Sequence, residues 1–178
     1  MGTLFQKLSL ILTDASILRK LGFMVGGLLI FRFMSTIPLP GVDHTQLQAL
    51  FQDSSLLGFL NVFSGGGLSN LSIMMLGVAP YITASIIMQL GTVLSPKLKA
   101  MYSEEGELGR KEFAQYSRLL TVPLAILQAV GLLFYFQSQG ILVNGGWYLF
   151  AVNVAVAIAG SLLLMWIGEL ITEYGIGN

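Results

Sequence analysis

Four apolar stretches, separated by more polar segments, are long enough to cross a lipid bilayer. These predicted spans cover residues 21–37, 71–94, 119–136 and 147–167. Their apolar residues run continuously rather than alternating, which indicates helices and not the strands of a membrane barrel. The pattern therefore predicts an all-α membrane protein, a polytopic bundle of transmembrane helices.

Composition favours the same class of protein. Only 10% of the 178 residues are charged and 54% are hydrophobic, whereas soluble domains average roughly 25% charged residues. Nine Lys and Arg balance nine Asp and Glu, so no net charge directs the chain to nucleic acid. The chain has no Cys and one His, which excludes disulfides and Cys-ligated clusters and leaves little for a metal site.

The positions of the basic residues predict the orientation in the membrane. Lys and Arg occur before the first span and between the second and third spans, and they are absent from residues 38–70 and 137–146. The positive-inside rule then places the tail 1–20, the loop 95–118 and the segment 168–178 in the cytoplasm. Loops 38–70 and 137–146 are expected outside.

The long outside loop contains a candidate short helix at about residues 56–64. Ser54 or Ser55 is suited to cap it, and its side chains are apolar nearly all round. It is too short to cross a bilayer. It is either an anchor at the membrane interface or a re-entrant element held in a protein cavity. A glycine run at 65–67 follows and is expected to act as a hinge.

The second span carries Pro80, which is expected to kink the helix. Val78, Ile82 and Ile86 are spaced four residues apart and share one face. The span is either an ordinary kinked helix packed on its neighbours or a helix that lines a path with an apolar constriction.

Two groups of small residues predict close contacts between helices, within the chain or with another subunit. Gly22 and Gly26 form a GxxxG pattern in the first span. The fourth span repeats alanine at every fourth position: Ala151, Ala155 and Ala159.

Catalysis has little support in the sequence. The last three spans contain no charged residue, and the single histidine, His44, lies in the outside loop. This excludes an intramembrane Ser–His pair, a buried aspartate pair and a proton relay. A passive path, a gate or a structural subunit remains. The charged loop 95–118 is either a solvated connection or a docking surface for a soluble partner.

Five runs resemble the SecY family of protein-translocation channels, in its bacterial form, from the first span to the last residue. They read IPLPG (37–41), NVFSGG (61–66), LGVAPYITASIIMQL (76–90), EGELGRK (105–111) and GELITEYGIGN (168–178).

The resemblance implies the N-terminal part of a ten-span fold, spans 1 to 4, with a fifth span expected after Asn178. It implies the central channel subunit of the Sec translocase. Such a channel passes unfolded secretory proteins across the membrane and releases transmembrane segments sideways into the bilayer. The alternatives are a structural subunit or a small-solute transporter subunit of a membrane complex.

The resemblance also assigns residues to roles. Val78 and Ile82 match the apolar pore ring, in which the family more often has Ile at the first position. Arg110 and Lys111 match cytoplasmic contact positions. The plug, which blocks the closed pore, matches Leu57, Phe59, Leu60, Asn61, Phe63, Ser64, Gly65 and Gly66. The lateral gate matches Thr83, Ile86, Gln89, Thr121 and Gln128.

The implied location is the cytoplasmic (inner) membrane of a bacterium. The implied membrane partners are SecE and SecG, with SecA or the translating ribosome supplying energy. The other implied partners are secretory preproteins, nascent membrane proteins and the phospholipid bilayer. No catalytic residue, metal, cofactor or direct nucleic-acid recognition is expected.

Overall fold

The computed structural model describes residues 14–104, 106–142 and 145–176, without the side chains of Asp53 and Phe63. Most of the predicted tail 1–20 lies outside these residues. Within them the chain is helical apart from turns and two isolated bridges, so the all-α class is confirmed for this part. The helices are α2 (Ala15–Met34), α3 (His44–Asp53), α4 (Ser55–Phe63), α5 (Ala79–Leu94), α6 (Pro96–Ser103), α7 (Gly106–Ser138) and α8 (Gly146–Tyr174).

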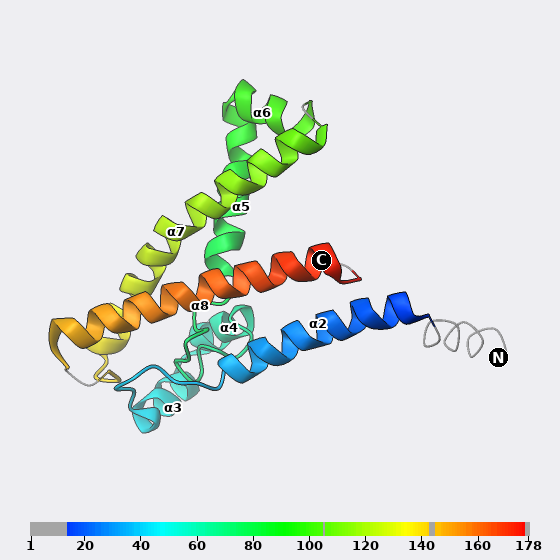
Figure 1. The fold of residues 1–178 in the computed structure, drawn as a ribbon. Helices are drawn as coiled ribbons and strands as arrows, with labels where there is room; N and C mark the ends of the chain where they lie inside the picture. The colour runs from blue at the N-terminus through cyan, green and yellow to red at the C-terminus, as the bar shows by residue number, and fades with distance from the viewer. Residues whose placement is uncertain (1–13, 105, 143–144, 177–178) are drawn as a thin grey trace.

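Two arms diverge from one end of the molecule (Figure 1). In one arm α2 lies beside α8, and in the other α5 and α6 pack on α7. The arms join where α7 passes into α8. The short helices α3 and α4 lie near this junction (Figure 1).

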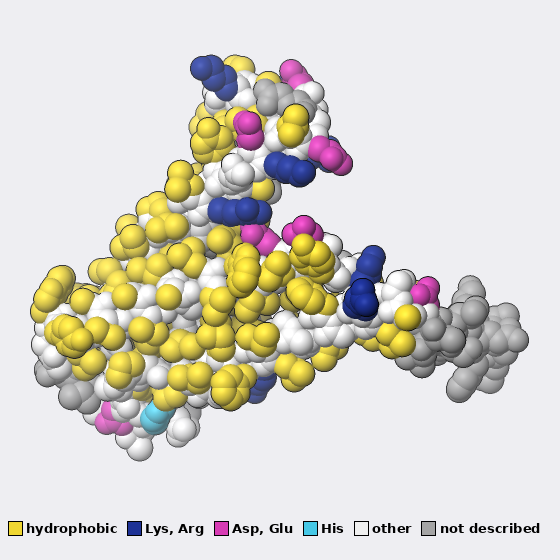
Figure 2. All heavy atoms as spheres, in the orientation of Figure 1, with side chains coloured by type: hydrophobic (Ala, Val, Ile, Leu, Met, Phe, Trp, Pro, Cys, Tyr) yellow, Lys and Arg dark blue, Asp and Glu magenta, His cyan; other side chains and the backbone are white. Residues whose placement is uncertain are grey.

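The interior of the molecule also lies near the junction of the arms. Side chains from α3, α4, the turns at 68–76, α7 and α8 bury one another there. The largest of them include Leu47, Leu68, Leu71, Met75, Leu133 and Phe136. Farther along the arms, apolar side chains cover the outside of the molecule, and charged ones gather toward the ends (Figure 2).

The helix α7 is far longer than the predicted span 119–136. Its buried residues follow a spacing close to four: Gly109, Phe113, Ser117, Thr121, Ala125, Ala129, Leu133 and Phe136. This stripe runs unbroken through the charged N-terminal turns, whose charges occupy the other faces. The prediction of a loop at 95–118 is therefore wrong, because α6 and the start of α7 occupy most of it. With 33 residues, α7 measures about 50 Å, which exceeds a hydrocarbon core of roughly 30 Å.

The second predicted span, 71–94, is helical only from Ala79. Residues 71–78 form successive turns, in which Leu71 has φ of 43° and Gly77 has φ of 58°. Pro80 lies in the first turn of α5, where its missing N–H has no helical partner to lose. The expected kink at Pro80 is therefore wrong, and the proline starts the helix instead.

Two of the described helices, α7 and α8, are long and apolar enough to cross a membrane, judged by length and composition. The helix α5 is apolar but has only 16 residues. The first predicted span, 21–37, lies largely in α2, which begins six residues earlier and so includes Arg19 and Lys20. Of the four predicted spans, only the last two therefore lie in described helices that are long and apolar enough to cross a membrane.

The small-residue pattern of α8 packs in a register different from the predicted one. The repeat Ala151, Ala155 and Ala159 is exposed, so it is not the buried face of α8 within the described residues. The buried set is Asn153, Ala157, Gly160, Ser161 and Ile167. Likewise, a Cβ added at Gly22 or Gly26 would have no neighbour within 4 Å, whereas Gly27 packs against Ile171. Contact of these small residues with another subunit stays a prediction.

Candidate functional site

The short helix α4 lies where the sequence predicts one. Ser54 is its N-cap, and the Ser54 hydroxyl accepts a hydrogen bond from the Leu57 N–H at 3.5 Å. Leu57 points into the core and is 3% exposed, whereas Phe59 and Leu60 are 63% and 40% exposed. Leu57 therefore fixes α4 to the protein core, and Phe59 and Leu60 keep apolar surface exposed.

Asn61 and Ser64 close the turn that follows α4. The Asn61 Oδ1 accepts from the Ser69 N–H at 2.9 Å. The buried Ser64 hydroxyl accepts from the Leu68 N–H at 2.9 Å and donates to the Asn61 carbonyl at 3.0 Å. These bonds satisfy backbone groups that have no helical partner. They give the turn a defined shape without regular secondary structure.

The glycines after α4 hold left-handed conformations and lie against α2. Gly65 has φ of +61°, and a Cβ added there would lie 2.6 Å from the Phe31 ring. Gly66 has φ of +86°, and its added Cβ would lie 3.5 Å from the Arg32 guanidinium. The residues matched to the plug are thus seated on the C-terminal turns of α2. The side chain of Phe63 lies outside the described residues.

A cavity of about 410 Å³ separates this turn from α7. Its lining is mainly apolar, with Ser64 on one element and Gln128 and Tyr135 of α7 on the other as its polar members. The lining consists of Leu60, Ser64, Leu68, Met75, Leu76, Ala79, Gln128, Gly131, Leu132 and Tyr135. The fold therefore brings one residue matched to the lateral gate, Gln128, to two residues matched to the plug. None of Thr83, Ile86, Gln89 and Thr121 lines this cavity.

Val78 and Ile82 lie one helical turn apart at the start of α5. Val78 is the N-cap residue, and its carbonyl accepts from the Ile82 N–H at 3.0 Å. Val78 is partly buried, while Ile82 and Ile86 are 41% and 50% exposed. These side chains present an apolar strip along α5 that the described residues leave largely open.

Two other residues matched to the gate, Thr83 and Thr121, form hydrogen bonds within their own helices. The Thr83 hydroxyl donates to the Ala79 carbonyl within α5 at 2.9 Å. Thr121 is fully buried, and its hydroxyl donates to the Ser117 carbonyl within α7 at 2.8 Å. Gln89 is exposed near the far end of α5. The two threonine hydroxyls are therefore satisfied inside their own helices.

Arg110 and Lys111 lie on the exposed N-terminal turns of α7, not in a loop. They line a cleft of about 500 Å³ with Ala114, Gln115, Arg118 and Glu173. Figure 2 shows this hollow between the two arms, with basic side chains on one wall and acidic ones on the other. At its inner end Arg118 on α7 forms an ion pair with Glu169 on α8. Sequence reasoning missed this pair, because nothing local links residues so far apart.

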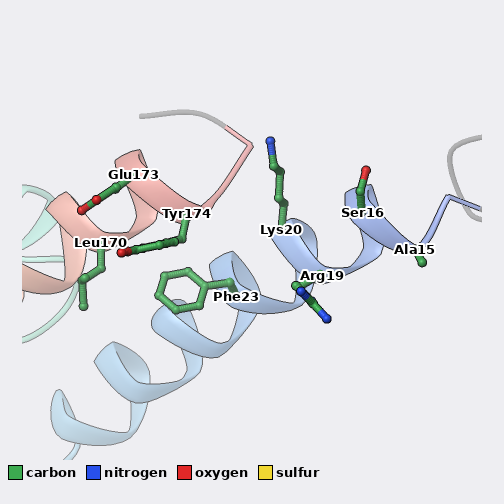
Figure 3. A pocket seen from close by; sticks show the side chains of 8 residues that line it. All are labelled: Ala15, Ser16, Arg19, Lys20, Phe23, Leu170, Glu173 and Tyr174. Carbon is green, nitrogen blue, oxygen red and sulfur yellow. The ribbon is translucent and has the colours of Figure 1, made fainter.

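An open groove of about 750 Å³ lies between the first turns of α2 and the last turns of α8. Phe23 and Tyr174 point toward each other at one end, with ring centroids 5.8 Å apart (Figure 3). Arg19, Lys20 and Glu173 add charge to its rim. Among the described residues no group of three His, Asp or Glu could hold a metal ion.

Three residues of α8 that the sequence analysis did not select hold the irregular segments in place. Asn153 donates to the Pro40 carbonyl, Ser161 donates to the Gly77 carbonyl, and Gly160 lies against the Ile73 backbone. The sequence signal that could have found these contacts was a set of polar and small residues that recur on one face of an apolar helix. The alanine repeat two positions away obscured it.

Comparison with known protein sequences places the chain in a family. The sequence model of the SecY family matches residues 72–178. The protein translocase subunit SecY of Escherichia coli K12 is 44% identical over 166 residues, which are 90% of this chain and 37% of that protein. The SecY subunit of Pseudomonas aeruginosa is 42% identical over 161 residues, 89% of this chain and 36% of that protein.

A third relative is the SecY subunit of Buchnera aphidicola subsp. Acyrthosiphon kondoi, 45% identical over 166 residues, 90% of this chain and 46% of that protein. The chain thus spans less than half the length of these curated relatives. The family model covers more than half of the chain, so the match is not confined to a short motif. On these grounds the chain belongs to the SecY family.

Proposed function

We propose that this chain supplies the N-terminal part, spans 1 to 4, of the central channel subunit of a Sec protein translocase. The observation that carries the proposal is the family match over residues 72–178, together with relatives that are each named protein translocase subunit SecY. The complete channel is expected to conduct unfolded secretory proteins across the cytoplasmic membrane. It is also expected to release transmembrane segments laterally into the bilayer.

In this proposal α4 and the turn at 64–70 form the plug. Support comes from its construction, because Ser54 caps the helix, and Asn61 and Ser64 close the turn with side-chain bonds. An element built this way can keep its own shape while it moves as a unit. Its contact with Phe31 is made at a glycine, while Leu57 and Leu68 join it to the core, so opening of the channel would have to separate these two side chains from the core.

Val78 and Ile82 form part of the pore constriction in this proposal. Both side chains are apolar and lie on one strip of α5 that the described residues leave largely open. An apolar ring can close a pore to ions by excluding water. Partner positions from the remainder of the subunit would complete the ring.

The lateral gate would run between α5 and α7, with Gln128 beside the plug cavity and Thr83, Ile86, Gln89 and Thr121 along the two helices.

The distribution of basic residues sets the orientation of the loops and the tail in the membrane, with the α6–α7 connection in the cytoplasm. Arg110 and Lys111 would then face SecA or the ribosome. SecE and SecG are the expected membrane partners.

Ion conductance of the complete translocase tests the constriction. Val78→Asn should raise ion leak through the resting channel, because a polar side chain lets water enter the ring. The matched control is Val93→Asn, since Val93 lies on the same helix and is 82% exposed. Equal leak in the two variants would contradict a pore role for Val78.

A further inference from the structure

The turns at 71–78 carry Val78 into α5, and α8 contacts their backbone directly. Gly160 of α8 faces the Ile73 peptide group, and a Cβ added at Gly160 would lie 2.9 Å from the Ile73 carbonyl carbon. Real Cβ atoms do not approach a neighbouring backbone so closely, so any side chain at 160 would push the turns away. The glycine therefore lets α8 approach the peptide backbone rather than side chains.

The neighbouring residue of α8 adds a hydrogen bond to the same segment. The Ser161 hydroxyl donates to the Gly77 carbonyl at 3.0 Å, and Ser161 is 1% exposed. In these turns backbone groups lack the regular helical partners, and an unpaired carbonyl away from water is costly. Ser161 thus fixes the peptide group that directly precedes Val78.

The other side of the segment is tied to the chain after α2. The Ile73 N–H donates to the Ile37 carbonyl at 3.0 Å, and the Leu39 N–H donates to the Leu71 carbonyl at 2.8 Å. The turns are therefore clamped between this strand-like stretch and α8. With the first side fixed, α8 determines where the last residues of the segment lie.

We infer that Gly160 and Ser161 are positioning residues that set the place of Val78, and through it Ile82, in the pore constriction. The inference rests on the proposed channel function. A displacement of Gly77 also displaces Val78 and Ile82, because Val78 follows Gly77 in the chain and the Val78 carbonyl accepts a hydrogen bond from the Ile82 N–H. A shift of the segment at Ile73 or Gly77 moves both side chains and opens the apolar seal.

The test uses the complete translocase reconstituted in lipid, with ion leak normalised to the amount of folded channel. Gly160→Ala and Ser161→Ala should each raise leak several-fold, and Ser161→Thr, which keeps a hydroxyl, should restore most of the seal. Gly168→Ala is the glycine control, because an added Cβ there has no neighbour within 4 Å. Ser117→Ala is the serine control, because its buried hydroxyl bonds only within α7.

A second readout reports position and not stability. The chain has no native Cys, so once the other parts of the translocase have been made free of Cys, Val78→Cys can be labelled alone by a water-soluble thiol reagent. Adding Ser161→Ala should change the labelling rate severalfold, and adding Ser117→Ala should leave it unchanged. If Gly160→Ala fails to fold, the variants Ser161→Ala and Ser161→Thr still test the positioning role.

The outcomes separate the two proposals. If Val78→Asn raises leak while Gly160→Ala and Ser161→Ala change neither leak nor labelling, the positioning role is overturned and the channel function stands. The same holds if these variants only lower the yield of folded channel. If Val78→Asn itself leaves leak unchanged, the proposed function fails first.

Discussion

The side-chain amide of Asn153 donates a hydrogen bond to the Pro40 carbonyl at 3.2 Å, joining α8 to the loop after α2. Asn153 is 2% exposed, and it shares a buried face with Gly160 and Ser161. This face contacts two irregular segments, around Pro40 and at 71–78. A helix that is apolar on its outer side thus organises the non-helical parts of the fold through a few polar and small residues.

Asn153→Ala should lower the free energy of unfolding by about 0.5–1.5 kcal/mol, because it removes the hydrogen bond from α8 to the carbonyl of the exposed residue Pro40. Denaturant unfolding of the complete membrane protein in detergent measures this change. Ala155→Ser, at an exposed position of the same helix, is the control and should have little effect. An unchanged midpoint for Asn153→Ala would contradict the anchoring role.

Gly65→Ala should lower the free energy of unfolding by roughly 1–3 kcal/mol, since a non-glycine residue is strained at φ of +61°. The added methyl would also press on the Phe31 ring. Gly58→Ala is the matched control: it lies inside α4, and its added Cβ has no neighbour within 4 Å. Alanine there should raise stability by about 0.5–1 kcal/mol. Equal effects at both glycines would refute a conformational requirement at Gly65.

The N-terminus of α3 should lose protection in acid. The Thr45 hydroxyl and the Thr45 and Gln46 N–H groups donate to Asp43, and these bonds lower the pKa of its carboxyl below the ordinary value. A lowered folded pKa means that the stabilisation is present above the unfolded pKa of about 3.9 and is lost as pH falls through the folded value.

Amide exchange at Thr45 and Gln46, expressed as protection factors, measures this loss. Asp43→Asn keeps an acceptor oxygen but removes the titrating group, so its protection should not vary with pH in this range. Identical acid profiles for the two proteins would show that Asp43 does not control the end of the helix.

Local features of the fold were predictable from the sequence. Ser54 followed by an apolar run indicates a capped short helix, and α4 begins at Ser55. The span at 71–94 was misread because hydropathy treats apolar turns and apolar helix alike. Proline is compatible both with a kink and with a first turn. The start of α5 is set by the left-handed Gly77 and by contact with α8.

The candidate site was only partly predictable, because local sequence patterns do not show contacts between residues far apart in the chain. The strip of Val78 and Ile82 follows from four-residue spacing alone. The hydrogen bond from Ser161 to Gly77 joins residues far apart in the chain, so no spacing of residues along the sequence predicts it. The helical N-terminal part of α7 was hidden because its exposed charges outweigh a buried stripe through Gly109 and Phe113.

Cross-linking from Ile82 tests the pore role most directly. The chain has no native Cys, so in a translocase whose other parts have been made free of Cys, Ile82→Cys carries a single site for a photoreactive thiol probe. A secretory polypeptide stalled during translocation should cross-link to this probe. The same probe at Trp147→Cys, an exposed position at the start of α8, should react with lipid only. Cross-links from Ile82 to lipid alone would contradict a path for polypeptides along α5.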